Sequence, residues 1–235
     1  MLYEIGNVLS NLWISPVVEY YKIFFGDAAD IIIDVGTRDG DDAAFIQSSL
    51  VTKEIYAIEA RQKAAALTKI KHPDFHVFPI AISNFNGTTK FCSVISEDPD
   101  YSGSSSFYNK KFVRKEYEYE EIVVNVITMD TFIEKNKLDY KFIDIVKVDI
   151  EGYTFEFLQG YEKHINNVKL FHLETEHRPT HSKHVNSSQI ADYMRSKNFV
   201  LAGTQYEWGC DIEDQIWINK YLINNEGERK KWLRS

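Results

Sequence analysis

Short apolar runs alternate with longer amphipathic segments through most of the chain. Five runs rich in β-branched side chains predict buried strands, over residues 31–35, 54–59, 75–82, 143–149 and 168–174. Helical patterns separate several of these runs, over residues 41–50, 62–71 and 154–164. Near-continuous apolar strands that alternate with helices indicate a parallel sheet covered by helices on both faces.

The end of the chain and one internal segment depart from this alternation. Residues 199–202 and 215–218 are apolar runs with no long helical pattern between them, so we expect an antiparallel edge. The predicted fold is therefore α/β, with a doubly wound, mostly parallel sheet of seven strands. Residues 88–94 and 121–127 alternate like strands and predict an inserted β-hairpin. Its serine-rich loop, Ser102–Ser106, is either a mobile lid over the site or an ordinary flexible linker.

Residues 1–29 predict a helical extension that precedes a single domain over residues 30–235. Apolar side chains such as Leu9, Trp13 and Val17 recur there at helical spacing. Pro16 is expected to break or restart this helix, because proline lacks a backbone N–H. The helix is expected to cap the core; a homodimer contact or a membrane-surface contact are the alternatives.

The charge balance limits the partners. The 235 residues include 27 Lys plus Arg and 35 Asp plus Glu, a net charge of −8, which disfavours a nucleic-acid partner. Residues 1–15 lack the features of a signal peptide, and no run approaches the roughly 18 apolar residues of a membrane-spanning helix. Cys92 and Cys210 have no zinc-site spacing. We therefore expect a soluble, cytoplasmic protein without a transmembrane segment.

A glycine-containing turn stands where the first strand meets the first helix, in the segment Asp34–Gly40. Gly36 permits a sharp turn and Gly40 a close approach of backbone to ligand. The dinucleotide fingerprint is absent, because Arg38 stands where its second glycine would lie. The acids at the start of the helix would repel a pyrophosphate but suit the amino group and sulfonium of S-adenosylmethionine (SAM). This favours SAM over a nicotinamide cofactor.

Glu59 supplies the second half of a nucleotide site. It ends the second strand, 25 residues after Asp34, where an acid can accept both ribose hydroxyls of an adenosine. The third strand runs into residues 81–84, which are expected to flank the adenine. The predicted cofactor-binding residues are Asp34, Gly36, Thr37, Arg38, Gly40, Glu59, Ala60, Ala81, Ile82 and Ser83.

Charged side chains gather at the ends of the fourth and fifth strands, where desolvation is costly unless they are paired or used. The predicted catalytic residues are Lys147, Asp149, Glu151, Glu174 and His177. Asp149 and Glu174 are candidate ligands for Mg²⁺ or Mn²⁺, with direct base catalysis as the alternative. A three-histidine site is not expected, because Pro179 interrupts the helical spacing of the histidines from His177 onward. Two further aromatic side chains are either sugar-stacking or core residues, Tyr206 and Trp208.

The sequence resembles the FkbM-type methyltransferases over about residues 30–220. The likeness is carried by Asp34-Val35-Gly36 with Gly40, Glu59, Ser104-Ser105-Ser106, Thr128-Met129-Asp130-Thr131-Phe132 and Lys147-Val148-Asp149-Ile150-Glu151-Gly152. The resemblance implies a Rossmann-like SAM-dependent methyltransferase fold and methyl transfer to oxygen, often a sugar hydroxyl in a glycan or glycosylated small molecule. Thr37-Arg38 departs from the Ala-Asn that is common in the family, which affects contacts to the methionine part of the cofactor.

Several other functions compete with this interpretation. The acceptor could instead be a non-sugar small molecule, a lipid or a protein. A nicotinamide oxidoreductase is disfavoured by the missing glycine fingerprint. A catalytically silent SAM-binding scaffold is disfavoured by the intact group Lys147, Asp149 and Glu151.

Overall fold

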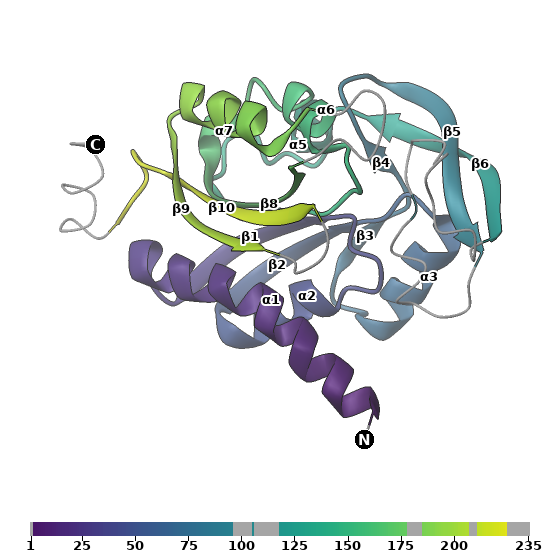
Figure 1. The fold of residues 1–235 in the computed structure, drawn as a ribbon, viewed down its shortest axis with the longest axis horizontal. Helices are drawn as coiled ribbons and strands as arrows, with labels where there is room; N and C mark the ends of the chain where they lie inside the picture. The colour runs from purple at the N-terminus through teal and green to yellow at the C-terminus, as the bar shows by residue number, and fades with distance from the viewer. Residues whose placement is uncertain (1, 96–104, 106–117, 178–184, 207–210, 225–235) are drawn as a thin grey trace.

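The computed structural model describes residues 2–95, 105, 118–177, 185–206 and 211–224, with side chains from residue 13 onward. A seven-stranded sheet runs through its centre in the order β3-β2-β1-β7-β8-β10-β9 (Figure 1). The strands are β1 (Ala28–Val35), β2 (Val51–Ile58), β3 (His76–Phe78), β7 (Ile143–Val148), β8 (Val168–Glu176), β9 (Phe199–Tyr206) and β10 (Ile212–Asn219). Strand β10 is antiparallel to both neighbours, which confirms the predicted edge, while β3, β2, β1, β7 and β8 pair in parallel.

Helices cover both faces of this sheet. Figure 1 shows α1 (Leu2–Phe25), α2 (Asp41–Ser49) and α3 (Gln62–Lys71) on one side, and α5 (Met129–Lys135), α6 (Thr154–Gln159) and α7 (Ser187–Ser196) on the other. A short 3₁₀ helix, η1 (Ile165–Asn167), leads into β8. Residues of β1 alternate between the two core halves: Ile32 packs with α1 and α2, whereas Ile31 and Ile33 pack with α5 to α7. The doubly wound α/β prediction is confirmed.

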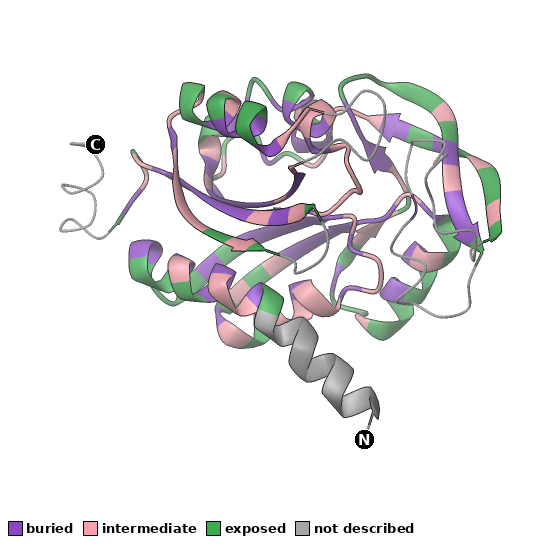
Figure 2. Cartoon of the chain, in the orientation of Figure 1, coloured by how far each residue is buried: buried purple, intermediate pink, exposed green. Residues whose placement is uncertain are grey.

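Helix α1 differs from the prediction because Pro16 lies inside one uninterrupted helix. Beyond the proline, Val17, Tyr21 and Phe24 are buried against the sheet and α2 (Figure 2). The Tyr21 hydroxyl also donates to Asp144 Oδ1 at 2.6 Å. Packing of this apolar face compensates for the hydrogen bond that proline cannot donate.

A second, smaller sheet stands beside the first. It consists of β4 (Ala81–Ile82), β6 (Glu118–Ile127) and β5 (Gly87–Ile95), in that order. Strands β5 and β6 form the antiparallel pair predicted as an insertion. The predicted third strand is divided, since β3 joins the main sheet and β4 pairs with β6. Most of the serine-rich loop lies outside the described residues, so the lid hypothesis stays a prediction.

Two helices were not predicted, and one is shorter than predicted. Helix α5 has only seven residues and α7 has four buried positions, so neither carries a long apolar pattern. Helix α6 ends at Gln159, not at residue 164, and Gly160 follows. A Cβ on Gly160 would lie 2.1 Å from the Ser83 carbonyl oxygen, so the chain passes this strand end only with glycine. No helix in the described part of the chain is long and apolar enough to cross a membrane.

Candidate active site

The carboxyl ends of β1, β2, β7 and β8 meet at one edge of the main sheet and surround a cavity of about 230 Å³. Ligands of open α/β sheets bind at this edge. The cavity is lined by Val35, Gly36, Thr37, Arg38, Asp39, Asp42, Ile58, Glu59, Ala60, Arg61, Ile80, Ala81, Ile82, Phe91, Ser105, Lys147, Asp149, Ile150, Glu151 and Glu174. Most of the predicted site residues are therefore brought together.

Gly36 forms the turn at the end of β1. Its φ is +81°, a conformation that other residues rarely adopt, and its N–H donates to Ile58 O at 2.9 Å. A Cβ at this position would lie 1.8 Å from the Asp149 carbonyl oxygen. Gly36 thus lets the β1 loop pass directly against the end of β7. Gly40 lies outside the cavity lining and caps α2 with φ +86°.

Glu59 directly follows β2 and lines the cavity. Its Oε2 accepts from Arg38 N at 3.2 Å, and its Oε1 accepts from Arg61 N at 2.9 Å. The Arg61 side chain adds an ion pair to the same carboxylate, with Nε 2.9 Å from Oε1. A buried carboxylate is thereby fixed in position and fully compensated.

Apolar side chains line the cavity beside Glu59. Ile58 and Ala60 flank it on β2 and the loop that follows, while Ala81 and Phe91 come from the smaller sheet. Ser105 also reaches the cavity, and its Oγ accepts from Val94 N at 3.0 Å. The predicted Ser83 is fully buried and does not line the cavity, so its place beside adenine is not supported by the geometry.

Lys147 is the buried cation at the centre of the site. Its Nζ lies 3.5 Å from Asp34 Oδ1, 3.1 Å from Asp42 Oδ2 and 3.3 Å from Asp149 Oδ2. Burial opposes its charge, but these three acids together raise the pKa of Lys147 well above its ordinary value. The ammonium therefore stays charged and holds β1, helix α2 and the end of β7 together.

Asp34 has a supporting position behind the cavity. It is 1% exposed, lies outside the cavity lining and accepts from the Thr37 hydroxyl at 2.6 Å. Burial raises its pKa, against the opposing charge of Lys147. We therefore place Asp34 with the groups that shape the β1 loop and orient Lys147, not with those that line the cavity.

Asp149 and Glu174 share a hydrogen bond at the far end of the cavity. Burial, and then the charges of Asp149 and Glu151, raise the pKa of Glu174 well above its ordinary value. Burial also acts to raise the pKa of Asp149, but Lys147, the bond to Glu174 and Arg38 lower it overall. The proton of the pair is therefore favoured on Glu174 and the negative charge on Asp149.

This arrangement makes stability depend on pH. Because the folded-state pKa of Glu174 is raised, its contribution to stability is present at low pH and is lost as the pH rises through that value. Glu174→Gln keeps a hydrogen-bond donor at this position but cannot ionise. We therefore expect its free energy of unfolding to exceed that of the wild type by an amount that grows with pH. Urea unfolding across a pH series measures this difference. Asp192→Asn, on the exposed side of α7, is the surface control, and identical profiles for wild type and Glu174→Gln would contradict the assignment.

His177 lies just after β8 but does not line the cavity. Its Nε2 is 2.6 Å from Glu213 Oε2, its Nδ1 is 3.1 Å from Ser187 Oγ, and its ring stacks on Tyr206. These contacts join the ends of β8, β9 and β10 to α7. The geometry thus gives His177 a structural role and gives Tyr206 a histidine partner. His181, His184 and Trp208 lie outside the described residues.

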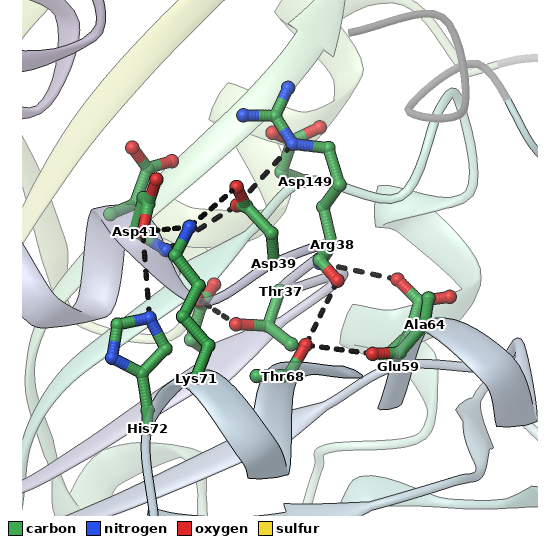
Figure 3. Close-up of polar contacts among 12 residues, drawn as sticks. Thr37, Arg38, Asp39, Asp41, Glu59, Ala64, Thr68, Lys71, His72 and Asp149 are labelled. Carbon is green, nitrogen blue, oxygen red and sulfur yellow. Dashed lines mark hydrogen bonds and ion pairs between the residues drawn. The ribbon is translucent and has the colours of Figure 1, made fainter. Parts of the chain in front are cut away.

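Paired charges form the rim of the cavity beside the β1 loop (Figure 3). Lys71 Nζ lies 2.6 Å from Asp41 Oδ1 and 3.2 Å from Asp39 Oδ2, and Arg38 Nε lies 3.5 Å from Asp39 Oδ1. The Arg38 side chain extends from the loop toward Asp149 (Figure 3). Arg38 thus reaches both ends of the cavity, with its main chain at Glu59 and its guanidinium on the side of Asp149.

The tentative metal site gains no third ligand. Within the described ranges, no group of three or more His, Cys, Asp or Glu side chains is placed to hold a metal ion. Asp149 and Glu174 remain a predicted pair only, and a buried cation, Lys147, already lies beside Asp149.

Several cavity residues were not predicted: Asp42, Arg61, Ile80, Phe91, Ser105 and Ile150. Asp42 could have been found, because it is the second residue of α2, two positions after Gly40. Arg61 and Phe91 have no comparable sequence signal. Arg61 lines the cavity because its side chain folds back onto Glu59, and Phe91 reaches the cavity from the inserted hairpin.

The family comparison decides the class of protein. The family model described as the methyltransferase FkbM domain matches residues 34–201, which include the β1 turn, Glu59, Lys147, Asp149 and Glu174. The chain belongs to the FkbM methyltransferase family. This methyltransferase therefore carries its family's domain over most of its length, and the cavity lies inside it. No curated protein sequence matches the chain.

Solved structures show the same fold at low sequence identity. A protein provisionally named as an rRNA methylase from Clostridium thermocellum has a TM-score of 0.50 and 10% identity, over 87% of this chain and 93% of that one. Magnesium protoporphyrin IX methyltransferase from Synechocystis PCC 6803, with bound SAM, has a TM-score of 0.48 and 10% identity, over 90% and 80%. The family match, the sheet order and the match to the Clostridium thermocellum protein together give the FkbM methyltransferase a Rossmann-like methyltransferase fold.

Proposed function

We propose that this FkbM methyltransferase moves a methyl group from SAM to a hydroxyl oxygen, and that the acceptor is a sugar in a glycan or a glycosylated small molecule. The single observation that carries the choice of oxygen is the pair of carboxyl groups, Asp149 and Glu174, that lines the end of the cavity beside Lys147. A hydroxyl is a weak nucleophile and gains most from a nearby proton acceptor.

The chemistry of the cavity walls fits SAM. Apolar side chains beside Glu59 suit an adenine ring, and the Glu59 carboxylate suits two ribose hydroxyls. The opposite end is acidic, with Asp42, Asp149 and Glu151, which suits a sulfonium and an ammonium. We therefore assign the adenosine to the Glu59 end and the reacting group to the Asp149 end.

SAM supplies an activated methyl group on a positively charged sulfur. The protein's task is then to place an acceptor oxygen in line with that carbon and to take up the hydroxyl proton. The Asp149 carboxylate accepts the hydrogen bond of the acceptor hydroxyl and then its proton. Glu174, whose pKa is raised, donates to Asp149 and keeps the ionised oxygen directed into the cavity.

Lys147 provides the positive charge beside Asp149 during this proton transfer. Its ammonium stabilises Asp149 in the ionised form, so a carboxylate is present before the acceptor arrives. We propose direct base catalysis by Asp149 over catalysis by a metal bound to Asp149 and Glu174. Activity that survives chelation supports this choice, and activity that EDTA abolishes and Mg²⁺ or Mn²⁺ restores overturns it.

The experiment that tests the function is an acceptor screen with methyl-labelled SAM across sugars, glycans, small phenols, lipids and proteins. Methyl transfer to a sugar hydroxyl, located by mass spectrometry, supports the proposal. Transfer only to a non-sugar acceptor overturns the sugar assignment. Binding of SAM without transfer to any of these classes favours a silent scaffold instead.

Glu59→Ala should weaken the binding of S-adenosylhomocysteine by about 1–3 kcal/mol, because two ribose hydroxyls lose their acceptor. Isothermal titration calorimetry measures this change. The matched control is Glu54→Ala, an acid of the same strand that bonds to Tyr56 and lies outside the cavity lining. The control should bind like the wild type, and an unchanged affinity in Glu59→Ala removes Glu59 from the ribose contact.

A further inference from the structure

The Glu59 carboxylate has all of its acceptor positions filled by protein donors. Two carboxylate oxygens offer about four lone-pair sites. Oε1 accepts from Arg61 N and Arg61 Nε, both at 2.9 Å, and Oε2 accepts from Arg38 N and Arg61 Nη2, both at 3.2 Å. A ribose diol can therefore bind Glu59 only if its two hydroxyls replace two of these four protein donors.

The four donors are of two kinds. The N–H groups of Arg38 and Arg61 belong to the main chain next to β1 and β2 and are fixed by the fold. The other two donors, Nε and Nη2, belong to one guanidinium on a flexible side chain. This fork presents two parallel N–H groups, one to each oxygen, as two ribose hydroxyls would. The guanidinium and the diol therefore compete for the same two positions.

We infer that Arg61 occupies the ribose position of the empty enzyme and has to release Glu59 before the cofactor can bind. The inference rests on the proposed placement of SAM in this cavity. Arg61 lines the cavity and is 8% exposed, and its guanidinium is bound to the carboxylate that the ribose would contact. When the site is empty, the fork compensates a buried carboxylate that would otherwise be costly.

The exchange sets the apparent affinity for the cofactor. A ligand that binds only the released form has its affinity reduced by the fraction of enzyme in that form. Charge-assisted, two-point contacts are strong, so the paired form dominates without ligand. Removal of the fork should therefore tighten cofactor binding, whereas removal of a merely structural residue would weaken it.

The test is calorimetric titration of S-adenosylhomocysteine into the wild type, Arg61→Ala and Arg61→Lys. We expect Arg61→Ala to bind about tenfold more tightly than the wild type, as expected if about a tenth of the wild type is in the released form. Arg61→Lys keeps the charge but loses the fork, so its affinity should lie between the two. The control is Arg195→Ala, which removes an exposed arginine paired with Asp192 on α7 and should not change the affinity.

A double-mutant cycle isolates the pair. In the Glu59→Ala background, Arg61→Ala should bring no gain, because there is no carboxylate left to release. Unchanged or weaker binding in both single Arg61 variants overturns the inference; Arg61→Lys decides if Arg61→Ala does not fold. Failure of the wild type to bind S-adenosylhomocysteine overturns the placement of SAM itself, which is a different outcome.

Discussion

Asp149→Asn is expected to slow methyl transfer about 100-fold or more while the variant still binds SAM, as for loss of a general base. The amide keeps the size of the carboxylate but cannot accept the hydroxyl proton. It also removes the negative charge beside Lys147 and Glu174, so the site loses the carboxylate that Lys147 holds in its ionised form. Single-turnover kinetics on the acceptor found by screening measure the chemical step directly.

The same measurement on two other variants separates base catalysis from a change in fold. Asp192→Asn makes the same chemical change at an exposed position of α7 and should keep full turnover. Glu151→Gln changes a cavity acid outside the Asp149–Glu174 pair and should act mainly on the KM of the acceptor. Near-normal turnover in Asp149→Asn, with an intact fold, would remove this residue from the mechanism.

Gly36→Ala is expected to lower the free energy of unfolding by about 3 kcal/mol or more and to abolish cofactor binding. Its added Cβ would lie 1.8 Å from the Asp149 carbonyl oxygen, a backbone atom that can move only with the end of β7. The residue also has φ +81°, which strains any side chain. Urea unfolding and calorimetric titration of S-adenosylhomocysteine measure the two effects.

Gly26→Ala is the matched control for backbone strain. Gly26 has φ +96°, but a Cβ there meets no atom within 4 Å. Its substitution should therefore cost only the backbone term, about 1–2 kcal/mol, and leave cofactor binding unchanged. If the two variants lose equal stability, the close approach of the β1 loop to β7 does not matter energetically.

The strands at the centre of the fold were predictable because their burial on both faces leaves continuous β-branched runs in the sequence. The glycine turn and Glu59 were predictable for a related reason, since the carboxyl ends of parallel strands meet at one edge. Helix α7 was not predicted, because it has few apolar side chains and polar residues precede it. The predicted break at Pro16 was wrong because helix propensity reflects only local sequence. Helix α1 is sustained by tertiary packing, in which Val17 and Tyr21 are buried.

The residues at the acidic end of the cavity were predicted, but their interactions with one another were not. Lys147, Asp149 and Glu174 were all named, yet the location of the proton depends on their distances and burial, which no spacing reveals. His177 was placed among the catalytic residues because it follows Glu174 closely; in the structure it pairs with Glu213 from a strand distant in sequence. Sequence patterns do not reveal such contacts between segments that lie far apart in the chain.

The cavity has two kinds of wall, one from the smaller sheet and one from the strand ends of the main sheet. The smaller sheet has its own apolar cluster of Ala81, Phe91, Val124 and Val126, and it contributes Phe91 to the cavity from β5. Glu59, Lys147, Asp149 and Glu174, in contrast, lie in or next to strands of the main sheet. Exchange of β5 and β6 between relatives should therefore alter the cavity beside Glu59 and leave Lys147, Asp149 and Glu174 at the opposite end in place.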